Sequence, residues 1–326
     1  MIPALRLSVA VETFPVAGTF TISRGSRTEA TVVVAVLDDG THQGRGECVP
    51  YARYGETVDS VVAEIRAAGD VVDRQALAQR LPPGAARNAL DCALWDIEAK
   101  RSAATVAALA GITPLAGPRL TCYTLSLATA AAMADSARAA ADKPLLKLKL
   151  GGAGDTERMR AVRAARPDAR LVADANEAWT LADLAPLLAV AAETGFELIE
   201  QPLPVADDWA LACATRTVPI CADESAHTSA DLARLEGLYD AVNIKLDKAG
   251  GLTEALAMAR AARFQGLRIM VGCMLSTSLA MAPALLLTEY ADWVDLDGPL
   301  LLAKDRDPAI SYASGHILPA PRTLWG

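Results

Sequence analysis

Beyond residue 114, eight short apolar runs alternate with alanine-rich helical segments, and this alternation restricts the fold more than any other feature of the chain. The runs are rich in leucine and β-branched residues, as expected of buried parallel strands. The expected strands cover residues 121–127, 144–150, 169–176, 196–202, 218–224, 240–246, 267–273 and 292–298. A strand–helix unit repeated eight times predicts a parallel (β/α) barrel.

The first 114 residues follow a different pattern. The runs RLSVAVETF, FTISRG and EATVVVAVLDDG are strand-like, and the last ends in Asp-Asp-Gly, which favours a hairpin turn. Residues 57–70 and 84–111 carry apolar side chains at helical spacing, with two prolines between them. We therefore expect an antiparallel sheet followed by helices, an α+β domain that precedes the barrel.

The segment after the eighth strand, from Pro299 to Gly326, shows no amphipathic helical pattern. We therefore expect seven barrel helices in place of eight. The tail is expected to run back and to cover or join the N-terminal domain.

Charge and cysteine content limit the partners and the compartment. The net charge of −8 argues against nucleic acid or an anionic membrane as the main partner, because both need a basic face. The six cysteines are scattered without a CxxC pair, and no apolar segment reaches the length of a membrane span. The opening MIPALRLSVAVETF lacks the apolar core of a secretory signal. We expect a soluble, cytoplasmic protein, and the sequence leaves its oligomeric state open, a homo-oligomer included.

Three carboxylates end three consecutive expected strands: Asp174, Glu200 and Asp223. Catalytic groups of such barrels lie at the carboxyl ends of the strands, so these side chains should converge. Converging buried carboxylates repel one another unless a cation neutralises them. Since none of the three histidines ends a strand, the donors are all oxygen, which favours a hard ion such as Mg²⁺.

Lysines flank these carboxylates. Lys147 and Lys149 lie on one face of the second strand, because side chains alternate along a strand, and Lys245 ends the sixth strand. Lys149 and Lys245 should therefore face each other across the metal site. One could remove the proton next to a metal-bound carboxylate, and the other could return a proton to the opposite face. Lys147 is expected to lower the pKa of Lys149, to bind the substrate carboxylate, or to do both.

These residues resemble the enolase superfamily, specifically its muconate-lactonizing subgroup. The matching motifs are KLK (147–149), DAN (174–176), EQP (200–202), ADE (222–224) and NIKLDKAGG (243–251). The resemblance covers the whole chain and implies a (β/α)₇β modified TIM barrel with an N-terminal α+β capping domain. It places the capping domain at 1–114, the barrel at 115–300 and a tail returning to the capping domain at 301–326.

The resemblance also implies roles for site residues. Lys149 and Lys245 correspond to the acid/base pair, and the three strand-end carboxylates correspond to the Mg²⁺ ligands. Asn176 would support the ligands from the second layer of side chains. Asp295 and Asp297, in DLDGP, look like the DxD element with which dipeptide epimerases hold the α-ammonium of the substrate. Both aspartates alternate onto one face, where a cation between them would relieve their repulsion.

The far end of the substrate is expected to meet the capping domain. Arg24 lies in the turn FTISRGSRTEA, and a guanidinium there would favour an acidic side chain. Arg27 and Arg53 are rival candidates. We expect Thr124 to hydrogen-bond the substrate backbone and Cys273 to line the pocket of the substrate.

The expected activity is Mg²⁺-dependent epimerisation of a small-molecule dipeptide, with L-Ala-D/L-Glu from murein peptide as the expected substrate and peptidoglycan recycling as the context. Two other activities of the subgroup, those of o-succinylbenzoate synthase and N-acylamino acid racemase, would use the same metal and lysines without needing the aspartate pair. A Schiff-base aldolase and a non-catalytic barrel are further alternatives.

Overall fold

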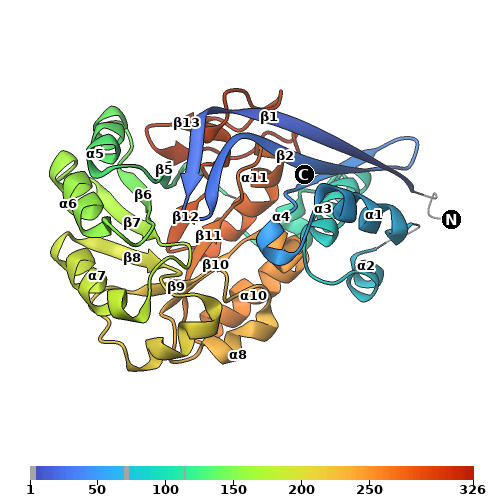
Figure 1. Cartoon of the computed structure of the whole chain (residues 1–326). Coiled ribbons are helices and arrows are strands. Elements are labelled where there is room, and N and C mark those ends of the chain that lie inside the picture. Colours follow the sequence, from blue (N-terminus) through green and yellow to red (C-terminus); the bar gives the residue numbers. More distant parts are fainter. Residues whose placement is uncertain (1–4, 70–72, 114) are drawn as a thin grey trace.

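The structure is a computed structural model that describes residues 5–69, 73–113 and 115–326. Figure 1 shows a long antiparallel hairpin and a group of helices beside a barrel of short strands. The fold class expected from the sequence, a (β/α)₇β barrel with an N-terminal capping domain, is confirmed.

The capping sheet has the order β1-β2-β3, with β1 (Arg6–Ile22), β2 (Gly25–Asp38) and β3 (Gln43–Cys48) all antiparallel. The two strand-like runs expected at the start join into the single long strand β1, whose pairing with β2 shifts register between Pro15 and Phe20. The Asp-Asp-Gly sequence makes the turn between β2 and β3, where Asp39 Oδ1 accepts hydrogen bonds from two backbone N–H groups. The tip of the β1–β2 hairpin reaches the barrel, since Ser23 Oγ donates to the carbonyl of Asn176.

Four helices complete the capping domain: α1 (Val58–Ala68), α2 (Arg74–Arg80), α3 (Ala85–Ser102) and α4 (Val106–Ala110). The stretch with helical spacing over 84–111 is divided at Ala103, whose left-handed backbone (φ 52°) ends α3. The sheet lies directly on α3, because a Cβ atom at Gly46 would lie 2.0 Å from the carbonyl oxygen of Ala89. Glycine in β3 therefore permits the close approach of sheet and helix.

Eight parallel strands form the barrel, in the spatial order β12-β11-β10-β9-β8-β7-β6-β5. They are β5 (Tyr123–Leu125), β6 (Leu145–Lys149), β7 (Arg170–Asp174), β8 (Phe196–Glu200), β9 (Ile220–Ala222), β10 (Ala241–Ile244), β11 (Arg268–Gly272) and β12 (Trp293–Asp295). The backbone N–H of Cys122 donates to the carbonyl of Val294 and joins the first strand to the last. All eight expected strands are therefore present, each within its expected range.

One small apolar cluster fills the inside of the barrel with a residue from each strand or its first neighbour. Its members are Cys122, Leu145, Val172, Leu198, Cys221, Ala241, Met270 and Trp293. A larger core lies between the strands and the outer helices. Apolar side chains thus fill the barrel interior below the carboxyl ends of the strands. Charged side chains occupy the mouth of the barrel, at those carboxyl ends.

Seven connections carry the outer helices. The α-helices are α5 (Ala130–Ala139), α6 (Asp155–Ala165), α7 (Leu181–Glu193), α8 (Leu232–Leu235), α9 (Leu246–Ala249), α10 (Leu252–Phe264) and α11 (Ser278–Ala284). Between β8 and β9 the chain forms the 3₁₀ helix η2 (Val205–Cys213) instead. No α-helix follows β12: residues 299–326, all described, contain one end of the short 3₁₀ helix η5 (Gly298–Leu301) and the strands β13 (Tyr312–Ala313) and β14 (His316–Ile317).

The tail contacts both parts of the molecule. Its strand β13 pairs with β14, and β14 pairs with β4 (Arg119–Leu120), just before the first barrel strand. Farther on, Trp325 Nε1 donates to the carbonyl of Cys92 in α3, and the backbone N–H of Gly326 donates to Asp96. The boundaries expected from the sequence, after residue 114 for the capping domain and after residue 300 for the barrel, stay a prediction.

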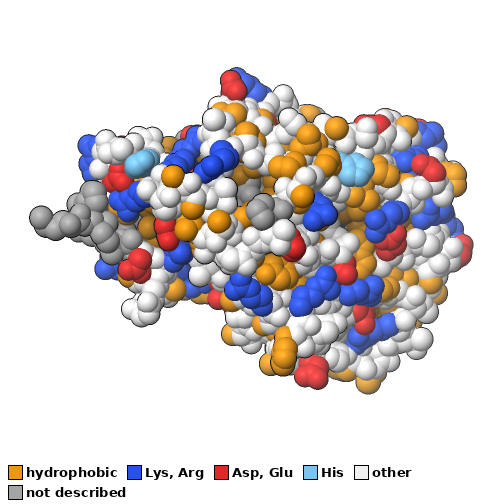
Figure 2. Space-filling view, turned by 180° about the vertical axis from the view of Figure 1, so that it is seen from behind, with side chains coloured by type: hydrophobic (Ala, Val, Ile, Leu, Met, Phe, Trp, Pro, Cys, Tyr) orange, Lys and Arg blue, Asp and Glu red, His pale blue; other side chains and the backbone are white. Residues whose placement is uncertain are grey.

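Two further observations concern the surface and the helices. Lysine and arginine side chains are interspersed with aspartate and glutamate over the face in Figure 2. Within the part of the chain that the structure describes, no helix combines the length and the apolar character that crossing a membrane requires.

Candidate active site

Three buried carboxylates meet at the carboxyl ends of neighbouring strands. Asp174 and Glu200 are the last residues of β7 and β8 and lie opposite each other in the ladder, and Asp223 directly follows β9. Each offers an oxygen, and these oxygens all lie within 4.8 Å of one another. The in-register parallel strands bring together side chains that are more than twenty residues apart in the sequence.

Neighbouring polar groups orient each carboxylate. The backbone N–H and the side-chain amide of Asn176 donate to the two oxygens of Asp174, at 2.8 and 3.0 Å. Asn243 Nδ2 donates to Glu200 Oε1 at 2.6 Å. Behind Asp223, the fully buried Lys248 donates to its Oδ1 at 2.6 Å.

The pKa values of the three carboxylates show that the cluster is stabilised by nearby positive charge. Burial, and next the charge of Asp174, raise the pKa of Glu200 to about 7. Burial also acts on Asp223, but the charges of Lys245 and Lys248 outweigh it and hold the pKa of Asp223 well below its usual range. An all-oxygen, closely spaced and buried donor set of this kind fits a hard divalent cation such as Mg²⁺.

The two lysines of β6 point the same way but end in different places. Lys147 Nζ lies 2.5 Å from Glu200 Oε2 and 2.6 Å from Asp295 Oδ2, beneath the carboxylates. Lys149 Nζ lies 2.7 Å from Asp174 Oδ2 and reaches the cavity above them. Burial opposes the charge of Lys147, but Asp295 and then Glu200 hold its pKa well above the usual value. Lys147 is therefore a fixed cation within the cluster.

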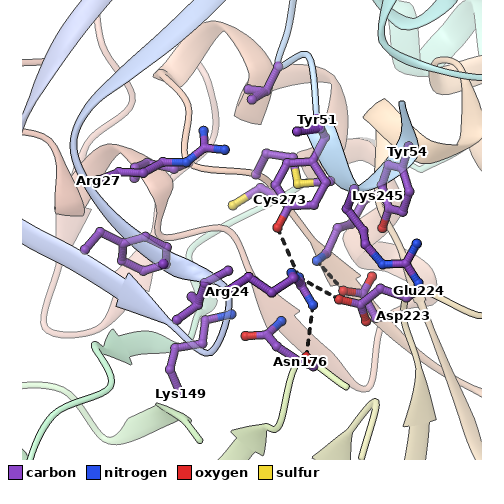
Figure 3. Close-up of a pocket in the computed structure, with 18 of the residues that line it drawn as sticks. Arg24, Arg27, Tyr51, Tyr54, Lys149, Asn176, Asp223, Glu224, Lys245 and Cys273 are labelled. Atoms are coloured by element: carbon purple, nitrogen blue, oxygen red, sulfur yellow. Dashed lines mark hydrogen bonds and ion pairs between the residues drawn. The ribbon is translucent and has the colours of Figure 1, made fainter. Parts of the chain in front are cut away.

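Lys245 lies across the cluster from Lys149. Its Nζ is 2.7 Å from Asp223 Oδ2, and its side chain also lines the cavity. Against the effect of burial, Asp223 and Glu200 hold the pKa of Lys245 well above the usual value. Figure 3 shows Lys149 and Lys245 on opposite sides of Arg24. Two primary amines thus face one cavity from opposite sides of the carboxylates.

The cavity has a volume of about 440 Å³ and lies between the capping domain and the barrel mouth. Its capping-domain wall includes Tyr51 and Tyr54, which belong to the loop after β3 and whose rings lie 5.3 Å apart, tilted by 54°. Cys273 lines it from the loop after β11. A space of this size suits a substrate as large as a dipeptide.

All three candidate arginines line this cavity. Arg24 donates to Glu224 Oε1 at 2.8 Å, to the carbonyl of Asn176 at 3.0 Å and to the Tyr51 hydroxyl at 3.1 Å. Arg53 makes a bidentate pair with Glu177, and Arg27 lies over the ring of Tyr51.

Asp295 and Asp297 are buried and are not among the residues that line the cavity. Asp295 pairs with Lys147, and its Oδ1 is buried without a hydrogen-bond partner within the described residues. Asp297 Oδ2 accepts a hydrogen bond from the backbone N–H of Thr124 at 2.6 Å. Burial, and then the charge of Asp295, raise the pKa of Asp297 to about 7. The charge of Asp295 thus acts against that of Asp297, and the role of this pair as an ammonium site stays a prediction.

Several site residues were not expected from the sequence. Asn243 lies in β10 and Lys248 in the short helix α9, and both belong to the motif NIKLDKAGG, which was the available signal. Glu224 follows Asp223, and Tyr51 and Tyr54 form an aromatic pair in VPYARYGE. These residues contact the site through partners that are distant in the sequence, so spacing alone did not mark them.

Two family models match the chain. Residues 5–111 match "Mandelate racemase / muconate lactonizing enzyme, N-terminal domain", and residues 130–321 match "Enolase C-terminal domain-like". Together they cover most of both parts of the fold.

Individual proteins are similar over almost the whole chain. An L-Ala-D/L-Glu epimerase of Escherichia coli is 47% identical over 95% of this chain and 98% of its own. An N-acetyl-D-glutamate racemase of Pseudoalteromonas is 43% identical, over 90% and 95%. A solved structure from Agrobacterium tumefaciens, an enolase family member with homology to dipeptide epimerases and with bound sodium and L-Ala-L-Glu, is 52% identical. It covers 99% of this chain and 100% of its own, with a TM-score of 0.96.

Proposed function

The chain belongs to the mandelate racemase / muconate lactonizing enzyme family of the enolase superfamily, and from this premise we propose that it epimerises the glutamate of L-Ala-D/L-Glu. It is an isomerase that acts on an amino acid derivative. One observation carries the proposal: two lysines face the same cavity from opposite sides of a carboxylate cluster suited to a cation.

The two lysines exchange the α-proton. One amine, in its neutral form, takes the proton from one face of the glutamate α-carbon, and the C–H electrons remain on the substrate. The ammonium on the opposite side then donates a proton to the other face, so the bond broken and the bond formed are both C–H and the configuration inverts. Lys149 and Lys245 are assigned these roles because both line the cavity, unlike Lys147.

Asp174, Glu200 and Asp223 would hold Mg²⁺. When bound, Mg²⁺ supplies positive charge that stabilises the negative charge developing on the substrate carboxylate as the α-proton leaves. Asn176 and Asn243 orient two of the three carboxylates through the hydrogen bonds described above. Lys147, held against Glu200, adds a fixed positive charge near the substrate carboxylate.

The ends of the dipeptide are assigned to two further groups of residues. The α-ammonium of the alanine is assigned to Asp295 and Asp297, because Asp295 Oδ1 is an unused buried acceptor. The side-chain carboxylate of the glutamate is assigned to Arg24, which enters the cavity from the hairpin tip. Thr124 and Cys273 lie next to these groups, Thr124 through its hydrogen bond to Asp297 and Cys273 in the cavity wall.

A second candidate activity is racemisation of an N-acylated glutamate. It is favoured by the 43% identity to the N-acetyl-D-glutamate racemase. N-acetylglutamate and L-Ala-Glu share the glutamate and the amide nitrogen, and they differ in the ammonium that only the dipeptide carries. The aspartate pair is therefore the feature that separates the two candidates.

We propose in addition that the reaction serves the reuse of murein peptides in the cytoplasm. The proposal is supported by the similarity to L-Ala-D/L-Glu epimerases.

The experiment that tests the function is ¹H NMR of L-Ala-L-Glu with the protein and Mg²⁺ in D₂O. Loss of the glutamate α-proton signal, together with appearance of the L-Ala-D-Glu diastereomer, is the expected result. N-acetyl-L-glutamate is measured in parallel, and faster exchange with it would favour the second candidate. Neither exchange nor inversion with either compound would contradict both.

A further inference from the structure

We propose that Glu224 is a specificity-determining residue, whose buried carboxylate forms a cation-binding group that Arg24 occupies, so that the pair selects an acidic second residue in the dipeptide. This inference rests on the proposed function and adds to it the residue that sets the charge of the accepted side chain.

Glu224 is placed to bind a cation. It follows Asp223 at the end of β9, lines the cavity, and is only 5% exposed. Its Oε1 accepts the hydrogen bond from Arg24 at 2.8 Å, and its Oε2 is buried without a hydrogen-bond partner. Across residues 5–69, 73–113 and 115–326, Arg24 is the one cation within 4.0 Å of this carboxylate.

A buried carboxylate requires such a partner. Removing a charged group from water is costly unless an opposite charge and hydrogen bonds replace the lost solvation. Arg24 comes from the capping hairpin, 200 residues away in the sequence, and Figure 3 shows its guanidinium directed at Glu224. The capping domain therefore supplies the charge that the barrel residue lacks.

The pair explains how an acidic side chain is accepted beside so many carboxylates. Arg24 donates to Glu224, Tyr51 and the Asn176 carbonyl through its two terminal nitrogens. Its Nη1 also lies 3.5 Å from Glu177 Oε2, so the Nε–H group is the one left for a substrate carboxylate. A lysine side chain in the same place would meet the guanidinium and be repelled. Glu224 thus holds Arg24 in place, and Arg24 masks Glu224.

The other two arginines of the cavity differ in this respect. Arg27 has no carboxylate within 4.0 Å among the described residues and lies over Tyr51. Arg53 is bound to Glu177, which does not line the cavity. Loss of Arg24 is therefore the change that would present an unpaired carboxylate to the substrate.

The test compares three dipeptides, L-Ala-L-Glu, L-Ala-L-Met and L-Ala-L-Lys, by NMR turnover and by calorimetric binding in the presence of Mg²⁺. Arg24→Met is expected to lower kcat/KM for L-Ala-L-Glu by about 10- to 100-fold and to raise it for L-Ala-L-Lys by at least about tenfold, the range for one hydrogen-bonded charge pair. L-Ala-L-Met reports whether the variant remains folded and catalytic.

Three control variants distinguish the effect of losing the Arg24–Glu224 pair from the effect of losing any positive charge in the cavity. Arg27→Met removes one positive charge from the same cavity and should gain nothing with L-Ala-L-Lys. Arg24→Lys keeps a cation beside Glu224 and should also gain nothing. In the double variant Arg24→Met/Glu224→Gln the gain with L-Ala-L-Lys should disappear.

The inference is overturned if Arg24→Met turns over L-Ala-L-Met but neither binds nor turns over L-Ala-L-Lys better than the parent. It is also overturned if Arg27→Met or the double variant shows the same gain. The proposed function is judged separately, by turnover of L-Ala-L-Glu in the parent. A parent that turns over no dipeptide contradicts that function, and the binding ratios still decide the role of Glu224.

Discussion

A methyl group at Gly272 should weaken metal binding without touching a metal ligand. Gly272 ends β11, and a Cβ atom there would lie 2.5 Å from Asn243 Oδ1 and 2.7 Å from Asn243 Nδ2. The backbone of Gly272 lies outside the left-handed region, so Gly272→Ala acts through this contact alone. The amide of Asn243 must move, and it is the group that donates to Glu200 Oε1 at 2.6 Å.

The size of the effect follows from that hydrogen bond. A hydrogen bond between an amide and a buried carboxylate is worth about 1.5–3 kcal/mol, and loss of a group that orients a metal ligand costs about 10- to 100-fold in metal affinity. Burial and Asp174 already raise the pKa of Glu200 to about 7. Its charged form is therefore only weakly favoured, and loss of the hydrogen bond from Asn243 would disfavour it further. We expect Gly272→Ala to weaken Mg²⁺ binding by about 10- to 100-fold.

Titration calorimetry of Mg²⁺ measures this effect, with Gly117→Ala as the matched control. A Cβ atom at Gly117 would have open space around it, and its backbone also lies outside the left-handed region. In an Asn243→Ala background the steric contact is absent, so Gly272→Ala should then cost little, as expected for two residues that act through one contact. Mg²⁺ affinity of Gly272→Ala within about twofold of the parent, or a full second loss in the double variant, would refute the reasoning.

Lys149→Ala and Lys245→Ala should each abolish epimerisation of both diastereomers, with kcat lower by roughly 10²–10⁴-fold, because each removes one of the two groups that carry the proton. A near-parental rate of α-proton exchange and inversion by NMR in either variant would exclude the two-base mechanism. Asp297→Asn should reduce kcat/KM for L-Ala-L-Glu far more than for N-acetyl-L-glutamate, and equal losses would remove the ammonium role. Burial raises the pKa of Asp247 to about 7, against about 3.9 in an unfolded chain. The folded protein therefore binds the proton more tightly, and it loses stability as the pH rises from about 4 to about 7. Asp247→Asn, which keeps an oxygen for its two N–H partners, should raise the Tm at pH 8 but not at pH 4. An equal change of Tm at both pH values in scanning calorimetry would contradict this.

The sequence by itself determined the barrel and the inner part of the site. The expected strand 169–176 contains β7 (Arg170–Asp174), and the other seven strands likewise fall within their expected ranges. All strands of a parallel barrel end at the same edge, so a charged residue at the end of an apolar run must lie at the barrel mouth. Alternation along β6 also placed Lys147 and Lys149 on one face. The strand positions and the alternation of side chains along a strand depend on residues close together in the sequence, so a sequence pattern can predict them.

The tertiary structure alone decided which charged groups pair. Arg24 contacts Glu224 across the boundary between the two domains, and Lys147 binds one oxygen of Asp295. The helical spacing over 84–111 likewise does not mark the break at Ala103, since the residues on both sides of it favour helix. The physical reason is the same in each case: a buried charge takes whichever partner the packing brings within about 3 Å, and that distance is set by the whole fold rather than by the neighbouring residues.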